Sequence, residues 1–382
     1  MTGARRATGR AVWIVCAASV ATAAVLTTAP AAQPPRTASD LEALAFAPAT
    51  YVAPRLGTAL TIDGRLDDEG WKGAAWTTAF VDIEGARKAA PRFQTRAKMA
   101  WDDQAFYLAA QLEEPDVWGT LTERDSVIFR DNDFEVFIDP DGDTHAYYEL
   151  EVNALATPWD LMLIKPYRDG GPAINAWDIA RLQVGVDVQG SLNQPDDRDR
   201  GWSVELALPW TSLKEAASPH RPPAAGDRWR VNFSRVQWQT DVVQGKTVKR
   251  TRPGGTEPLP EDNWVWSPQG VVDMHVPERW GYVQFGAAAA ALDAAPVMVD
   301  TTERLKWALR RLYYRQRDYH RTRQRYAATL EELEAERVRV SGLTFRPTLR
   351  TTDSLYEITA PGDGVIGHID QDGRVWITKV AR

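Results

Sequence analysis

Acidic and apolar side chains alternate along two consecutive segments of the chain, residues 133–138 and 147–153. Because side chains point to opposite faces of a strand in turn, each segment would collect its polar residues on one face. These polar residues are Asp133, Glu135, Glu149, Glu151 and Asn153. If the two strands are neighbours, their carboxylates lie side by side, which destabilises a sheet unless cations or hydroxyl groups fill the gap.

Positive partners for these carboxylates are available in the sequence. We expect them to be Arg124, Arg130 and Arg235. The alternative is a solvated outer face that carries only surface ion pairs. Two carboxylates about 5 to 9.5 Å apart can also hydrolyse a glycosidic bond, and Glu135 with Glu151 could reach that separation. Facing carboxylates are commoner as polar rims, so we predict a binding surface without catalytic residues.

Tryptophan is unusually abundant, with 16 residues in a chain of 382. A sugar ring has apolar C–H faces and a rim of hydroxyl groups, so its binding site needs a flat indole beside hydrogen-bonding side chains. Four tryptophans stand among polar residues and are our stacking candidates: Trp118, Trp159, Trp177 and Trp238. The alternative for each is a loop anchor. Trp71 and Trp76 are predicted to be core residues instead.

An acidic turn follows the first of the two segments. Asp139, Asp141 and Asp143 supply hard oxygen ligands of the type that Ca²⁺ takes, although the spacing is not that of an EF-hand. A structural Ca²⁺ and an ordinary aspartate-rich hairpin turn are therefore equal alternatives. The five histidines have no paired spacing, so a zinc site is not expected. We expect no organic cofactor.

Short β-rich segments bounded by Asp, Gly, Pro or Asn position these residues. The segments are 95–103, 104–114, 133–143, 145–155, 182–190, 201–210 and 228–239. Their spacing, without long helical patterns between them, predicts a mainly β fold, an antiparallel β-sandwich. An arginine-rich helix beginning at Thr302 and Glu303, a second short helix over 328–336 and a β-meander follow it. This helix-plus-meander region is the C-terminal tail.

The N-terminal residues predict export. Arg5, Arg6 and Arg10 precede an apolar run over 11–26, and residues 29–31 form a plausible cleavage site. A membrane anchor is the alternative, but a span needs about 20 strongly apolar residues, so no stable span is expected after cleavage. The mature chain would lie outside the cell or in the periplasm. A net charge of −7 argues against nucleic acid as a partner.

Several segments between Tyr51 and Phe285 resemble family 9 carbohydrate-binding modules, which share a sandwich architecture with DOMON domains. They include IDGRLDDEGW from Ile62, RDNDFEVFIDPDGD from Arg130, and GWSVELALPWTSL from Gly201. The resemblance implies that two indoles clasp a terminal sugar of an oligo- or polysaccharide. We expect Arg124, Asp133, Asn153 and Arg235 to orient that ligand. It also implies a role in carbohydrate catabolism and a calcium ion.

The resemblance divides the chain and leaves two rival functions open. The predicted parts are a signal peptide (1–31), a linker (32–50), the sandwich (51–286) and the tail (287–382). One rival is a DOMON-type haem domain with axial ligands among Met99, Met162, His145 and His275. The other is a component associated with glycoside hydrolysis. The sequence predicts no oligomeric state.

Overall fold

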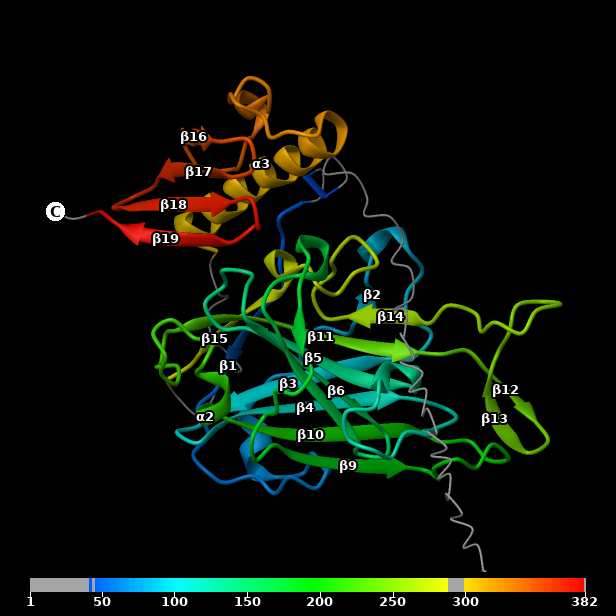
Figure 1. The fold of residues 1–382 in the computed structure, drawn as a ribbon. Helices are drawn as coiled ribbons and strands as arrows, with labels where there is room; N and C mark the ends of the chain where they lie inside the picture. The colour runs from blue at the N-terminus through cyan, green and yellow to red at the C-terminus, as the bar shows by residue number, and fades with distance from the viewer. Residues whose placement is uncertain (1–40, 43–44, 288–298, 381–382) are drawn as a thin grey trace, which may run out of the picture. The chain divides into compact units, whose positions relative to one another are not determined.

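The computed structural model describes residues 41–42, 45–287 and 299–380. The predicted signal peptide and most of the predicted linker lie outside the described residues. Two β-sheets form the larger part of the fold (Figure 1). The four-stranded sheet has the order β3 (Thr95–Trp101), β4 (Ala105–Glu113), β10 (Gly201–Pro209) and β9 (Gln183–Gln189), and all its pairs are antiparallel.

The second sheet has nine strands. Its main path is β1 (Thr50–Ala53), β15 (Gly281–Phe285), β11 (Arg228–Gln237), β5 (Asp133–Asp139), β6 (Tyr147–Asn153), β7 (Pro158–Leu163) and β8 (Ala173–Ile174). From β11 it branches to β14 (Asp262–Val265) and then β2 (Val81–Asp82). The β1–β15 pair is parallel, and the other pairs between these strands are antiparallel. The predicted β-sandwich is thus confirmed.

The core lies between the two sheets because each strand buries alternate residues there. Phe134, Val136, Leu150 and Phe233 face Leu108, Leu206 and their neighbours in one large apolar cluster. The opposite face of the nine-stranded sheet, called here the outer face, is covered as well. A second cluster with Phe137, Tyr147, Leu161 and Trp280 packs on it. Every residue of β5 and β6 is consequently buried.

The tail folds as predicted into one long helix and a meander. Helix α3 (Thr301–Arg323) begins at Asp300, whose side chain accepts a hydrogen bond from the Glu303 amide at 3.0 Å and thereby caps the helix. Leu305, Leu309 and Leu312 of this helix pack on the four-stranded sheet of the tail. The sheet consists of β16 (Thr348–Thr351), β17 (Tyr356–Pro361), β18 (Val365–Asp370) and β19 (Val375–Lys379). Among the described helices, none is long and apolar enough to cross a membrane.

Two local predictions were wrong. The expected second short helix is a series of turns with a single 3-10 turn at Ala335–Arg337. Glu332 accepts hydrogen bonds from Arg325 and the Ala328 amide, and such bonds favour a turn over a helix. Trp76 is half-buried beneath Arg96 and Lys98 on the small sheet, not in the core. Trp71 is buried as predicted and donates to Glu205 at 2.6 Å.

Candidate functional site

The predicted row of carboxylates exists on the outer face. In the β5–β6 register Asp133 pairs with Asn153, Glu135 with Glu151, and Phe137 with Glu149. One carboxylate oxygen each of Asp133, Glu135 and Glu151 lies within 4.8 Å of the others. We call Asp133, Glu135, Glu149 and Glu151 the outer-face acid cluster. Its members come from two adjacent rigid strands, so their spacing is set by the sheet.

Burial governs the protonation of this cluster. Exposure is 0% for Asp133, 5% for Glu135 and 2% for Glu151. Loss of hydration raises the pKa of Glu135 to about 7 and that of Glu149 to about 8. The pKa values of Asp133 and Glu151 are also raised by burial, with further increases from the neighbouring carboxylates. Near neutral pH these side chains can therefore donate as well as accept hydrogen bonds.

Aromatic rings border the acid cluster. Trp159 pairs with Glu151 across the strands, is half-buried, and lies 6.4 Å from the Phe129 ring, measured between centroids. The Phe129 amide donates to Glu151 at 2.8 Å, and the Trp238 indole donates to the Phe129 carbonyl at 2.9 Å. Three partly exposed rings thus follow one another beside the buried acids, which is the combination that a saccharide requires.

Lysine and tyrosine side chains complete the surroundings of the cluster. Lys249, on the hairpin of β12 (Thr240–Val243) and β13 (Lys246–Lys249), places its ammonium 3.4 Å from the Trp238 ring centroid. Burial lowers the pKa of Lys249 to about 8, although nearby acids including Asp133 oppose that shift. Tyr167 is 52% exposed, and burial with the charges of Glu149 and Glu151 raises its pKa to about 12.

Two of the four predicted stacking tryptophans lie elsewhere. Trp118 is 4% exposed, so the structure contradicts the prediction that its indole forms an open plate. Trp177 stacks on Tyr148 at 4.6 Å and belongs to the packing between the sheets, on the other side of the large sheet from Trp159. Both behave as the loop anchors that were the alternative. Trp159 and Trp238 are the two that the fold brings to the acid cluster.

The expected arginine partners do not reach the cluster. Arg235 points to the interior, where it lies 3.4 Å from Glu114 and donates to Thr95 at 3.0 Å. Arg124 contacts Asp160 and Asp178. No ion pair joins Arg130 to the cluster within the described residues. The predicted roles of Arg124 and Arg235 in orienting a ligand beside Asp133 are therefore wrong.

Asn153 has a structural role. Its amide nitrogen donates to the Leu121 carbonyl at 2.8 Å and to Asp131 at 3.0 Å, while its oxygen accepts from the Leu155 and Thr157 amides. With 0% exposure and all these bonds made within the chain, it has nothing left for a ligand. The prediction that Asn153 orients a sugar is not supported by this geometry.

Positively charged side chains of the tail lie beside the predicted calcium turn. Asp139 accepts from the Gly142 and Thr144 amides at 2.9 and 3.0 Å. Lys306 of α3 donates to the Gly142 carbonyl at 3.2 Å, and Arg374 lies 2.8 Å from Asp143. Burial and the neighbouring aspartates nevertheless raise the pKa of Asp139 well above its usual range and that of Asp141 to about 6. One carboxylate oxygen each of Asp139, Asp141 and Asp143 lies within 4.8 Å of the others, so a structural calcium ion at this turn stays a prediction.

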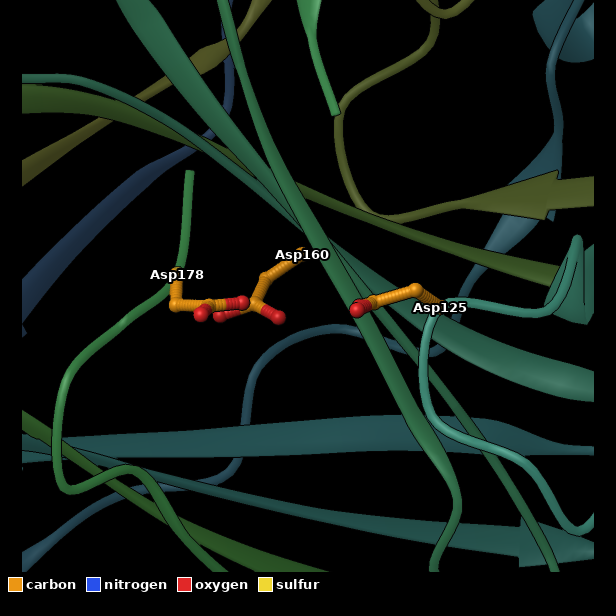
Figure 2. Close-up of side chains that lie close together, drawn as sticks. All are labelled: Asp125, Asp160 and Asp178. Atoms are coloured by element: carbon orange, nitrogen blue, oxygen red, sulfur yellow. The ribbon is translucent and has the colours of Figure 1, made fainter. Parts of the chain in front are cut away.

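A third acidic group lies at the edge of the sandwich. Figure 2 shows Asp125, Asp160 and Asp178 with their carboxylates directed toward one another. Arg124 forms ion pairs with all three, and Asp160 also accepts a hydrogen bond from the Ile179 amide. A guanidinium from within the chain therefore compensates much of the charge of this group.

The residues named for a haem site are dispersed. Met99 and Met162 pack in the core cluster between the sheets. His275 lies on the outer face, where its Nδ1 is 2.9 Å from the Tyr147 hydroxyl, and burial lowers its pKa to about 4. His145 is in the turn before β6. The described residues therefore do not bring these side chains to one apolar pocket.

Sequence reasoning missed several residues of this face, namely Phe129, Tyr167, Lys249 and Glu261. Glu261 raises the pKa of Glu135 by its charge, after the larger effect of burial. A detectable signal existed only for Phe129, an aromatic residue six positions before Glu135 in a segment that must turn into β5. The other three come from loops and a hairpin whose position depends on tertiary packing.

Fold and site together define a two-sheet β-sandwich with an aromatic and acidic surface on one sheet. A scan against protein families matches residues 62–226 to the carbohydrate family 9 binding domain-like family. Residues 62–226 are thus similar to a domain of the family 9 type, which confirms the resemblance predicted from the sequence. No curated protein matches the chain.

Solved structures also match the chain. One is a family 9 carbohydrate-binding module from Caldicellulosiruptor kristjanssonii in complex with cellotriose, with 15% identity and a TM-score of 0.39, covering 66% of this chain and 99% of the module. A structure of a family 9 module from the same organism in complex with glucose has 15% identity and a TM-score of 0.40, covering 62% of this chain and 96% of the module.

Proposed function

We propose that this protein binds a saccharide on the outer face of its large sheet, without transforming it. Two features support the proposal: the match of residues 62–226 to the family 9 type of domain, and the aromatic rings beside the acid cluster. The single observation that carries it is the pairing of half-buried Trp159 with buried Glu151 on neighbouring strands.

The proposed contacts follow from the chemistry of a sugar. Trp159 stacks on the apolar face of a ring, and Trp238 borders the same ligand from the Phe129 side. Glu135 and Glu149, whose pKa values are raised to about 7 and about 8, meet hydroxyl groups as donors or acceptors. Both carboxylates form part of one close, mutually repelling group, which suits hydroxyl recognition better than the separated acid and nucleophile of a hydrolase.

Calorimetry with a panel of soluble oligosaccharides tests the proposal. Trp159→Ala is expected to weaken binding by about 1–3 kcal/mol, the range for loss of an aromatic stacking platform. Trp177→Ala is the matched control, because that indole is also half-buried but lies on the other side of the sheet. The proposal fails if no saccharide binds, or if Trp159→Ala and Trp177→Ala weaken binding equally.

We further propose that the protein is exported and serves carbohydrate catabolism. The charged and apolar N-terminal residues support export. Mass spectrometry of protein recovered from the periplasm or medium should find a mature chain that begins near residue 32. Recovery of a chain that still starts at residue 1 would contradict cleavage.

A further inference from the structure

Helix α3 borders a cleft of about 550 Å³, a volume within the range of small-molecule sites. We call it the arginine cleft. Its lining combines three arginines with three apolar side chains, namely Arg304, Arg311, Arg339, Phe46, Trp307 and Val340. None of its residues belongs to the segment 62–226 that matches the family 9 type of domain. The cleft is therefore a feature of this chain that the saccharide surface does not explain.

Two of the arginines keep their charge without a carboxylate partner. Arg304 donates to the Ser341 carbonyl at 3.0 Å, and Arg339 donates to the Val338 carbonyl at 3.1 Å. Over residues 41–42, 45–287 and 299–380, no ion pair reaches either guanidinium. A backbone carbonyl satisfies one donor but does not neutralise the charge, so both groups remain able to attract an anion.

The third arginine carries a buried donor that is unpaired. Arg311 forms an ion pair with Glu42 at 2.7 Å and donates to the Arg339 carbonyl at 2.6 Å. Its Nε atom is buried and has no hydrogen-bond partner in the described part of the chain. Glu42 also pairs with Arg315 at 2.5 Å, so one carboxylate serves two guanidinium groups. Buried donors without partners are rare, and this one is available to an acceptor bound beside Arg311.

An aromatic pair forms the apolar part of the cleft. The Phe46 and Trp307 rings stack with centroids 4.9 Å apart and 12° between their planes. Trp307 is 5% exposed, whereas Phe46 and Val340 are only half-buried. A bare inorganic anion would gain nothing from these side chains. An anionic group attached to an apolar body would gain from burying that body against them.

We propose that the arginine cleft binds a small organic oxyanion, a carboxylate or phosphate group on an apolar body. Guanidinium groups bind both oxyanions through paired, charge-assisted hydrogen bonds. Phe46 and Val340 contact the apolar body. A concave site of this volume is suited to one small molecule and not to a flat lipid surface. The inference does not depend on saccharide binding, because the cleft is separate from the outer face of the large sheet.

Calorimetry with the full-length protein at constant ionic strength tests the proposal. The probes are benzoate, phenyl phosphate, inorganic phosphate and benzyl alcohol. At least one of the two aromatic anions should bind, and the tighter of them identifies the oxyanion. Inorganic phosphate lacks the apolar body and benzyl alcohol lacks the charge, so each should bind at least about tenfold more weakly. Failure of both aromatic anions to bind, or equally tight binding of either control probe, would overturn the proposal.

Arg304→Gln and Arg339→Gln locate the site. Each should weaken binding of the tighter aromatic anion by about tenfold or more, because each removes charged donors from the cleft. Without ligand, both variants should keep a Tm within about 2 °C of the wild type, since neither side chain forms an ion pair among the described residues. Arg346→Gln removes the same charge from an exposed arginine outside the cleft and should leave binding unchanged. Equal weakening by all three substitutions would mean that binding follows net charge alone, and the assignment would be wrong.

Discussion

Buried acidic residues occur in two regions of this molecule with opposite electrostatics. On the outer face, Glu135 and Glu149 have few partners, and burial raises their pKa values to about 7 and about 8. Where α3 meets the sandwich, Glu278 is equally buried and Glu303 is largely buried, yet their pKa values fall to about 2. Burial acts to raise the pKa in both regions, but near α3 it is outweighed by arginine, lysine and tyrosine neighbours.

The partners of Glu278 explain the difference. Arg168 donates to its carboxylate at 2.9 Å, Arg310 of α3 lies 3.8 Å away, and the Tyr314 hydroxyl also donates to it. Such a network converts a buried charge into a structural contact. A cluster that lacks this network is unfavourable for folding, and such raised pKa values make it a candidate functional site. Similar burial therefore accompanies an ion-pair network in one region and carboxylates without ion pairs, among the described residues, in the other.

Glu278→Gln should have the largest effect, because it removes the carboxylate that buried Arg168 and Arg310 share and leaves Arg168 with Asp169 alone. We expect a loss of about 3–5 kcal/mol in the free energy of unfolding, measured by urea denaturation at pH 7. Glu336→Gln, at an exposed glutamate of the tail, should change it by less than about 0.5 kcal/mol. Equal small effects in both variants would show that the ion pairs and hydrogen bonds around Glu278 contribute little to the free energy of unfolding.

The sequence predicted the sandwich and the pairing within the acid cluster, because strand alternation depends only on local pattern. It was less informative about which charged side chains form ion pairs with one another. Val231, Phe233 and Arg235 share one face of β11, so the same alternation could have placed Arg235 in the interior. Its contact with Glu114 spans 121 positions, and no local pattern indicates such a pairing.

Exposure was the other property that sequence could not predict. Trp159 directly follows Pro158 and Trp118 comes three positions after Pro115, yet only Trp159 retains appreciable exposure. Whether a loop tryptophan is covered depends on distant segments that pack over it. Lys306 and Arg374 illustrate the same limit, because they contact an aspartate turn more than 160 positions away.

Glu149→Gln should have an intermediate effect of opposite sign. The folded-state pKa of Glu149, about 8, is above the ordinary value of 4.5, so the folded protein keeps a proton that the unfolded chain releases. Its contribution to stability is fully present below pH 4.5 and declines as the pH rises through 8. In EDTA at pH 8, the variant should be more stable than the wild type by at least about 1 kcal/mol. At pH 4 the two should be nearly equal, and a gain of the same size at both pH values would contradict this origin.

Arg374→Gln should have the smallest effect, although it too removes a cation from an aspartate. The Arg374 side chain is 55% exposed, and an ion pair in contact with water contributes little because solvent screens it. We expect a loss of less than about 1 kcal/mol in the free energy of unfolding at low salt, and about half of that or less in 0.5 M NaCl. A loss as large as that of Glu278→Gln would mean that exposure does not separate the two kinds of ion pair. The difference in electrostatics between the outer face and the region near α3 would then depend only on the ion pairs and hydrogen bonds around Glu278.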